Sequence, residues 1–169
     1  MLGFIRMKTK TVIQKTNAAR LLDRAGIDYK LVPYEVDEQN LAADHVASQL
    51  GEPIEQVFKT LVLHGDKTGH FVCIVAGNRE VDLKKAAKAS GNKKSELIPM
   101  KELFPVTGYI RGGCTALGMK KKLPAYISEE ALSFPFIYVS AGQRGLQIKV
   151  SPADWIKATD AVPADLCQA

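Results

Sequence analysis

Two apolar runs separated by a short polar segment constrain this fold more than any other feature. Residues 57–64 read VFKTLVLH and residues 69–76 read GHFVCIVA, and both runs are rich in the β-branched and aromatic side chains that favour strands. The segment between them, Gly65-Asp66-Lys67-Thr68, has the residue types of a tight turn. The sequence therefore predicts a β-hairpin over residues 57–76.

Capping residues and stop glycines predict short helices on both sides of this hairpin. Thr16-Asn17 precedes apolar residues at helical spacing, and Gly26 follows them as a stop signal. Ser151-Pro152 supplies a cap residue and then a proline at the first helical position. Signals of this kind predict helices over 17–25, 43–50, 82–89 and from 152 onward, with single helical turns opened by Pro53 and Pro99.

Short strand-like stretches account for much of the remaining chain, and we expect most neighbouring strands to pair antiparallel. The chain has 169 residues, of which 46% are hydrophobic, enough for one buried core and too few to divide into two. We predict one α+β domain over residues 1–169, in which residues 1–15 are flexible or contain an alternative start at Met7. The strand-like stretches are 28–36, 109–111, 125–127, 136–140 and 146–150.

Composition narrows the setting in which the protein works. The first residues lack the apolar core and cleavage site of a secretory signal, and no apolar run approaches the roughly 20 residues that cross a bilayer. Cys73, Cys114 and Cys167 are an odd set without CxxC spacing, which favours reduced thiols, and Cys167 is expected to lie at a frayed terminus. We therefore expect a cytoplasmic protein with no membrane contact.

Several common chemistries lack their motifs in this chain. There is no GxGxxG, Walker loop, HExxH or GxSxG segment. His45, His64 and His70 are not at metal-ligand spacing with the cysteines, so they are interpreted as surface or strand-end residues and no metal is assigned. Cys114 has no nearby histidine in the sequence to activate it as a nucleophile. We expect neither a metal nor a cofactor.

Lys59 is the first residue that suggests a site. Alternation along the strand places it on the same face as Leu61 and Leu63. A lysine among leucines either extends its ammonium to solvent or anchors an anion or a carbonyl group. The pattern alone leaves both interpretations open.

Two further segments carry possible binding groups. Residues 108–118 form a long glycine-rich connection that either approaches a ligand with its backbone N–H groups or is an ordinary turn. Ser140 precedes a second turn, over residues 141–145, that contains Arg144. Lysines and arginines outnumber acidic residues by 23 to 18. The basic residues form either a surface for RNA phosphates or a solvated face, and they are Lys84, Lys85, Lys88, Lys93, Lys94, Arg111 and Lys120–Lys122.

Taken together, these segments resemble the YbaK/EbsC family of Cys-tRNA(Pro) deacylases. The resemblance extends from about Thr16 to Trp155 with the motifs in the same order. It implies an α+β fold whose mixed, largely antiparallel sheet forms a partly closed barrel packed by helices. The motifs that carry it are VFKTL (57–61), DLKK (82–85), TGY (107–109), GG (112–113), LG (117–118), YVS (138–140) and RGL (144–146).

The resemblance also implies residue roles and a reaction. Lys59 matches the essential lysine, and Arg111, Lys120, Lys121 and Arg144 are expected to contact tRNA. The attached cysteine's own thiol would attack its ester carbonyl and expel the tRNA, without a protein nucleophile, metal or cofactor. The substrate-binding positions are Tyr34, Leu41, Thr60, Gly112, Gly113, Ser140 and Gln147.

Two departures from the family pattern keep other functions open. Ala116 stands where the loop commonly has proline, and Gln147 stands where the family usually has aspartate. The alternatives are a deacylase specific for Ala-tRNA or Ser-tRNA and a non-catalytic tRNA-binding accessory protein of a synthetase. The expected partners are the aminoacylated 3′ end of tRNA and prolyl-tRNA synthetase, with no DNA.

Overall fold

The computed structural model describes residues 4–6 and 12–169. Within the first segment of the chain, β1 (Phe4–Arg6) pairs antiparallel with β2 (Val12–Gln14). The prediction of a flexible start or an alternative start within residues 1–15 falls partly on residues 1–3 and 7–11, which lie outside the described residues.

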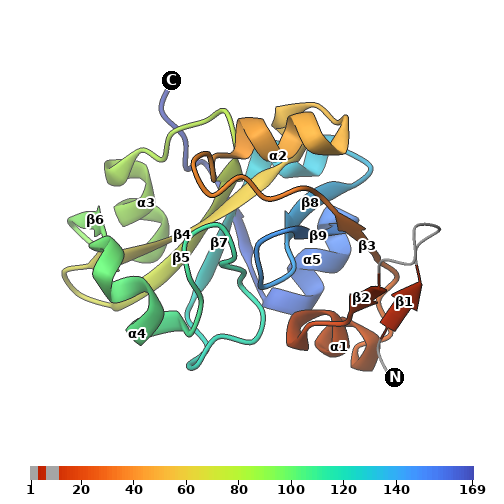
Figure 1. Cartoon of the computed structure of the whole chain (residues 1–169). Helices are drawn as coiled ribbons and strands as arrows, with labels where there is room; N and C mark the ends of the chain where they lie inside the picture. Colours follow the sequence, from red (N-terminus) through yellow and green to blue (C-terminus); the bar gives the residue numbers. More distant parts are fainter. Residues whose placement is uncertain (1–3, 7–11) are drawn as a thin grey trace.

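The predicted hairpin is confirmed and forms the centre of a five-stranded sheet (Figure 1). Strands β4 (Phe58–Gly65) and β5 (Gly69–Ala76) pair antiparallel along their whole length. β7 (Ala125–Ser128) adds parallel to β5, and β10 (Val162–Ala164) adds parallel to β7. On the other edge, β6 (Ser95–Leu97) pairs antiparallel with the end of β4. The described sheet therefore has the order β10-β7-β5-β4-β6.

A second, three-stranded sheet has the order β3-β9-β8 and is antiparallel throughout. It contains β3 (Lys30–Pro33), β8 (Ile137–Ser140) and β9 (Leu146–Val150). A single parallel bridge between Val57 and Tyr138 connects it to the start of β4. The α+β class and the largely antiparallel pairing are confirmed, whereas the strands that the structure describes do not close into a barrel.

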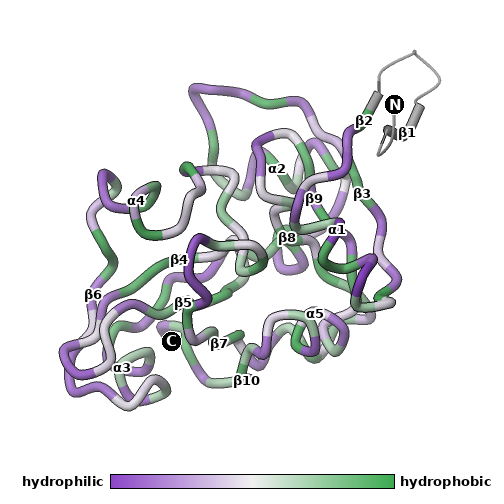
Figure 2. Tube along the Cα trace, turned by 90° about the horizontal axis from the view of Figure 1, so that it is seen from below, coloured by the Kyte–Doolittle hydropathy of each residue, from purple (hydrophilic) through white to green (hydrophobic). Residues whose placement is uncertain are grey.

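Short helices cover these sheets, and sequence signals account for where they begin. Thr16 Oγ1 accepts a hydrogen bond from Ala19 N–H, and Ser151 Oγ accepts one from Asp154 N–H, so both predicted caps are confirmed. Helices α1 and α5 lie together at one end of the molecule, away from α3 and α4 (Figures 1 and 2). The α-helices are α1 (Asn17–Arg24), α2 (Ala43–Leu50), α3 (Leu83–Ser90), α4 (Leu103–Thr107) and α5 (Pro152–Thr159), with 3-10 turns η1 (Ile54–Gln56), η2 (Met100–Glu102) and η3 (Glu129–Ser133).

The main core fills the space between the two sheets and helices α1 and α5. Trp155 of α5, Leu22 of α1 and Ile148 of β9 are fully buried members of this cluster. Helix α3 packs a second cluster against the other face of the hairpin, around Phe71 and Leu166. Figure 2 shows a hydrophobic stretch along β5, whose last six residues are all buried. The hairpin is thus packed on both faces, and the Val57–Tyr138 bridge joins the two sheets.

Three expectations from the sequence need correction. Residues 109–111 form a loop and a turn rather than a strand. The helical turn opened by Pro99 continues through η2 into α4. Cys167 is only 3% exposed and pairs through a β-bridge with Val81, so the C-terminus is anchored at that point. All three cysteines are free and buried.

The described part of the chain contains no helix long and apolar enough to span a membrane.

Candidate active site

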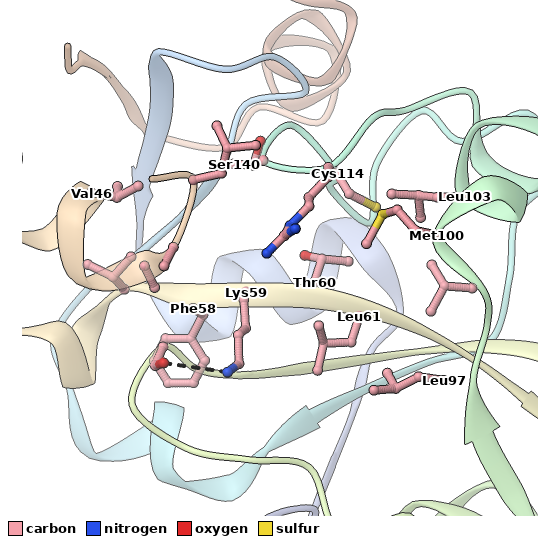
Figure 3. Close-up of a pocket in the computed structure, with 18 of the residues that line it drawn as sticks. Val46, Phe58, Lys59, Thr60, Leu61, Leu97, Met100, Leu103, Cys114 and Ser140 are labelled. Atoms are coloured by element: carbon pink, nitrogen blue, oxygen red, sulfur yellow. Dashed lines mark hydrogen bonds between the residues drawn. The ribbon is translucent and has the colours of Figure 1, made fainter. Parts of the chain in front are cut away.

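A cavity of about 600 Å³ lies beside β4, close to where the two sheets meet (Figure 3). One wall comes from the start of α2 and the loop before it, and the facing wall comes from β6, η2 and α4. The glycine-rich loop and the ends of β8 and β9 complete the lining. Cavities of roughly 300–1,000 Å³ are typical of small-molecule sites. This cavity is therefore the candidate active site.

The cavity lies along one edge of β4, where one neighbouring segment contacts the start of the strand and another contacts its end. β8 approaches this edge at Val57, and Ile98 N–H donates to Val62 C=O at 3.2 Å further along. On the opposite edge Gly77 N–H donates to Val57 C=O, and backbone groups in an antiparallel ladder alternate between the two edges. The backbone N–H and C=O of Thr60 therefore face the gap between the two neighbours, at the cavity.

Lys59 lies on the opposite side of β4 from Thr60. Figure 3 shows Lys59 and Leu61 projecting from one side of the strand and Thr60 from the other, toward Cys114 and Met100. The Lys59 Nζ is 3.4 Å from the Gly77 carbonyl oxygen, to which it donates, and 4.0 Å from the Glu80 carboxylate. The Lys59 side chain is 28% exposed and that of Glu80 is 78% exposed. The ammonium is thus oriented at the cavity without being fully neutralised.

The polar side chains that line the cavity include both hydrogen-bond donors and acceptors. Thr60 Oγ1 and Gln147 Oε1 are buried and have no hydrogen-bond partner among the described residues. Ser140 faces Gln147 across the β8–β9 pair, and Ser140 Oγ accepts a hydrogen bond from Gly142 N–H at 3.1 Å. Buried polar atoms without partners carry a free-energy cost of about 1–3 kcal/mol each. A ligand that donates to these atoms would remove that cost.

Side chains at Gly112 and Gly113 would be strained. Gly112 has a φ of +85°, and a Cβ there would lie 3.4 Å from Arg144 Cγ. A Cβ on Gly113 would lie 3.1 Å from Gln143 Cα. Arg144 Nε donates to the Arg111 carbonyl oxygen at 2.8 Å, and its guanidinium also pairs with the Glu38 carboxylate at 2.8 Å. Arg144 therefore holds the glycine loop against residue 38.

Cys114 lines the cavity but is unsuited to act as a nucleophile. The residue is 8% exposed, and burial raises the pKa of its thiol to about 12. At neutral pH the thiol is therefore protonated, and the thiolate is the reactive form. Within the described part of the chain the cavity lining includes no histidine, and its single carboxylate belongs to Glu80. No side-chain triad is assembled here.

The structure brings together seven of the predicted site residues and separates the others. Tyr34 packs against the cluster beneath α2, and its N–H donates to the Gly145 carbonyl oxygen at 2.9 Å. Gly113 lies in the glycine-rich loop but not in the lining, and Arg144 packs against this loop. Lys120 and Lys121 also lie outside the lining. The residues that line one cavity are Leu41, Lys59, Thr60, Arg111, Gly112, Ser140 and Gln147.

Sequence reasoning missed one wall of the site. Leu97, Met100 and Leu103 line the cavity from β6, η2 and α4, and Figure 3 shows them gathered on one side. The apolar residues after Pro99 were a signal in the sequence, but a single helical turn gave no reason to place them near Lys59. Glu80 was missed for the same reason, since it comes from the loop after β5.

No group of three or more His, Cys, Asp or Glu residues in the described ranges is arranged to hold a metal ion. His64 and His70 face each other across the hairpin end, with ring centroids 5.1 Å apart. His45 Nε2 lies 3.0 Å from the Glu35 carbonyl oxygen. The three histidines thus occupy strand-end and helix-surface positions, as the sequence predicts.

Comparison with known proteins identifies this architecture. A protein of Enterococcus faecalis named "Putative Cys-tRNA(Pro)/Cys-tRNA(Cys) deacylase EbsC" is 46% identical over 160 residues, which are 95% of this chain and 98% of that protein. A crystal structure of "a putative trans-editing enzyme for prolyl tRNA synthetase" is 27% identical, with a TM-score of 0.78, over 91% of this chain and 99% of that one.

Another crystal structure, of the hypothetical protein APE2540, shares the fold with a TM-score of 0.80 at 21% identity, over 88% of this chain and 97% of that one. The family described as "Aminoacyl-tRNA editing domain" matches residues 37–158, a range that includes the whole cavity wall from Leu41 to Gln147. The chain therefore belongs to the aminoacyl-tRNA editing domain family, as its resemblance to the YbaK/EbsC deacylases predicts.

Proposed function

We propose that this protein hydrolyses the ester bond of mischarged aminoacyl-tRNA in trans, with Cys-tRNA(Pro) as its substrate. The observation that carries the proposal is the cavity beside β4, whose lining includes Lys59 and two polar side-chain atoms without hydrogen-bond partners among the described residues, Thr60 Oγ1 and Gln147 Oε1. A volume of about 600 Å³ is in the range that holds an aminoacyl group and a terminal nucleoside. The relative at 46% identity carries this activity in its name.

The cavity suits a reaction in which the substrate supplies the nucleophile. The cysteine thiol would attack its own ester carbonyl, so that a C–S bond forms, the C–O bond to the ribose breaks, and the 3′ oxygen takes up the proton. Water then opens the resulting thiolactone to release cysteine. Because burial keeps the Cys114 thiol protonated at neutral pH, we assign the protein the part of positioning and charge stabilisation.

We assign the roles in this reaction as follows. Lys59 stabilises the negative charge that develops on the ester oxygen, and the Thr60 N–H at the open edge of β4 is a second donor. Gln147 Oε1 and Thr60 Oγ1 accept from the ammonium of the aminoacyl group. Leu41, Gly112 and Ser140 shape the cavity, while Tyr34 and Gly113 support its walls from behind. Arg111, Lys120 and Lys121 contact tRNA phosphates, and Arg144 acts by fixing the loop.

Gln147 favours a second candidate, a deacylase with a different amino-acid preference. Two opposite unit charges 4 Å apart attract by about 4 kcal/mol at an effective dielectric constant of 20, whereas a neutral hydrogen bond contributes about 0.5–1.5 kcal/mol. A cavity with a neutral amide at position 147 therefore holds the substrate ammonium less strongly than one with a carboxylate. Ala-tRNA and Ser-tRNA are the substrates that this candidate predicts.

The wider setting of the reaction is part of the same proposal. We infer that the chain acts in the cytoplasm as one domain over residues 1–169 and receives its substrate from prolyl-tRNA synthetase. We further propose that the two sheets curve around the main core as a partly closed barrel, which the Val57–Tyr138 bridge between them supports. The full-length similarity to a free-standing relative supports the single domain.

The deciding experiment is deacylation of radiolabelled Cys-tRNA(Pro), Ala-tRNA(Pro) and Ser-tRNA by the wild-type protein and by Lys59→Ala at fixed salt. We expect release of cysteine by the wild type and its loss by 100-fold or more in the variant, the size of effect seen when an oxyanion donor is removed. Release of alanine or serine alone would favour the second candidate. No release from any substrate would leave a non-catalytic tRNA-binding protein.

A further inference from the structure

Exposed apolar side chains gather at the mouth of the cavity. Leu97, Met100 and Phe104 are 49%, 58% and 55% exposed, and we call these three residues the η2–α4 platform. Met100 and Phe104 are four residues apart in the continuous helical run of η2 and α4, and residues at this spacing share a face. Because Leu97 and Met100 also line the cavity, the platform is continuous with the candidate active site.

Cations flank this platform without being neutralised. The Lys120 Nζ lies 4.9 Å from the centroid of the Phe104 ring, and the Lys120 stem is held against Gly108, where a Cβ would come within 3.2 Å of it. Arg111 lines the cavity mouth and is exposed. Neither side chain forms an ion pair with a carboxylate of the residues that the structure describes, in contrast to Lys85 and Lys122.

An exposed aromatic ring beside unpaired cations is a surface of the kind that proteins use to bind single-stranded nucleic acid. Proteins hold unpaired strands by stacking bases on aromatic side chains while basic residues follow the backbone phosphates. Phe104 offers the ring, Lys120 and Arg111 offer the charges, and the cavity beside them is where the esterified end must enter. A protein docked on the platform would instead cover the cavity mouth and obstruct entry of the substrate.

We propose that the η2–α4 platform binds an unstacked nucleobase of the single-stranded 3′ end of tRNA, next to the nucleoside that carries the ester. The inference rests on the proposed function and adds the surface that holds the strand. Phe104 supplies the stacking contact on the ring face that Lys120 does not cover, and Met100 and Leu97 extend the apolar surface toward the cavity. Lys120 neutralises the adjoining phosphate. Recognition of this kind is tolerant of base identity, since every base presents a flat π-face.

The primary test compares Phe104→Ala, Phe104→Trp and the matched control Leu132→Ala. Leu132 is 53% exposed and lies in η3, outside the cavity lining. For Phe104→Ala we expect KM for the mischarged tRNA to rise about 5- to 100-fold with kcat unchanged, as loss of one stacked base predicts. Phe104→Trp should restore the wild-type KM, and Leu132→Ala should leave it unchanged. An unaltered KM in Phe104→Ala would overturn the inference.

Binding of uncharged RNA separates this inference from the proposed function. We expect the Phe104→Ala variant to bind intact tRNA more weakly than the wild type by the same factor. The variant and the wild type should bind equally well to tRNA trimmed of its single-stranded 3′ nucleotides. An equal loss for the trimmed RNA would overturn the inference, because the contact would then lie on the duplex. If the wild type deacylates nothing yet intact tRNA still requires Phe104, the proposed function fails and the inference stands.

Fluorescence gives a direct readout of the contact. Trp155 is fully buried, so RNA in solution cannot contact it. A change in tryptophan emission when RNA is added to the Phe104→Trp variant therefore reports on position 104. Stacking should quench this emission with intact tRNA and leave it unchanged with trimmed tRNA. Quenching by prolyl-tRNA synthetase in the absence of RNA, together with none by intact tRNA, would assign the platform to a protein partner and overturn the inference.

Discussion

At the scale of single residues, the surroundings of Lys59 support the proposal that its ammonium acts in the cavity. The side chain is 28% exposed, and its ammonium is turned to the Gly77 carbonyl and the cavity rather than extended into bulk solvent. What orients it is the backbone of the loop after β5, which no local pattern predicts. Alternation along β4 correctly separates Lys59 and Leu61 from Thr60 (Figure 3).

Replacing Glu80 should affect activity far less than replacing Lys59. Glu80 is 78% exposed and its carboxylate lies 4.0 Å from the Lys59 Nζ, so solvent screens the pair. Exposed pairs contribute about 0–1 kcal/mol, which corresponds to at most about a five-fold change in rate. We therefore expect Glu80→Gln to lower kcat/KM for mischarged tRNA by less than about five-fold. A fall comparable to that of Lys59→Ala, measured in the same assay, would show that Glu80 has a direct role.

At the scale of elements, the sequence predicts what is local and misses what depends on distant contacts. The hairpin, the caps of α1 and α5 and the stop at Gly51 follow from neighbouring residues and are confirmed. Tyr109–Arg111 has strand-like composition but forms no strand, because its backbone bonds locally: Tyr109 N–H donates to Thr107 Oγ1, and the Ile110 carbonyl oxygen accepts from Gly113 N–H. Strands β6 and β10 were missed because each is short and depends on its neighbour.

The same division applies to the candidate site. Lys59, Thr60, Ser140 and Gln147 could be named from motifs, since they lie on strands whose positions in the chain are regular. The apolar wall from η2 and α4 could not, because its place beside β4 results from the pairing of β6 with Leu63–Gly65. Long-range pairing brings that wall to the cavity, and alternation and capping contain no information about it.

Asn92 ties the hairpin turn to the end of α3, and its loss should destabilise the protein. Its side-chain Oδ1 accepts from the N–H groups of Lys67 and Thr68 at 2.8 and 2.9 Å, and its Nδ2 donates to Ser90 Oγ. Asn92→Ala leaves these groups unpaired, at a cost of about 2 kcal/mol in the free energy of unfolding, or about 4–8 °C in Tm. Differential scanning calorimetry measures the change.

The control for this variant is Asn78→Ala, whose exposed amide makes one weak contact at 3.5 Å to Glu55. Its Tm should stay within about 1–2 °C of the wild type, as for most surface substitutions. Gly65→Ala tests the same junction from the other side, since a Cβ there would lie 2.1 Å from Asn92 Nδ2. Equal Tm values for Asn92→Ala and Asn78→Ala would show that Asn92 does not anchor the hairpin turn.

At the scale of the whole molecule, the cavity is a consequence of how the two sheets join. The Val57–Tyr138 bridge fixes the second sheet to the start of β4, while β6 takes the end of the same edge. The interval between them leaves backbone and side chains of β4 available to a ligand, at a position surrounded by rigid elements. The catalytic lysine proposed here therefore belongs to a long strand of the central hairpin, and helices, strands and loops from other parts of the chain complete its surroundings.

The burial of two cysteine thiols predicts how the free energy of unfolding changes at alkaline pH. Burial raises the pKa of Cys73 and of Cys114 to about 12 in the folded protein, from an ordinary value near 9. Between these values the unfolded chain releases protons that the folded protein retains, so stability must fall as pH rises. The stability that the two protonated thiols contribute is fully present below about pH 8.5 and is lost as the pH rises toward about 12. The free energy of unfolding falls by at most about 1.4 kcal/mol per pH unit for each thiol.

Urea unfolding at pH 8, 9, 10 and 11 measures this slope. The variant that combines Cys73→Ala with Cys114→Ala should be less stable than the wild type at pH 8, because it has lost buried volume, yet lose less further stability as pH rises. Val75→Ala is the matched control, since Val75 is fully buried beside Cys73 in the second cluster and does not titrate. It should keep the wild-type slope. If the double variant and Val75→Ala lose stability in parallel from pH 8 to pH 11, the two thiols do not cause the loss of stability at alkaline pH. Other groups must then cause it, such as Tyr138, whose pKa is also raised to about 12 by burial.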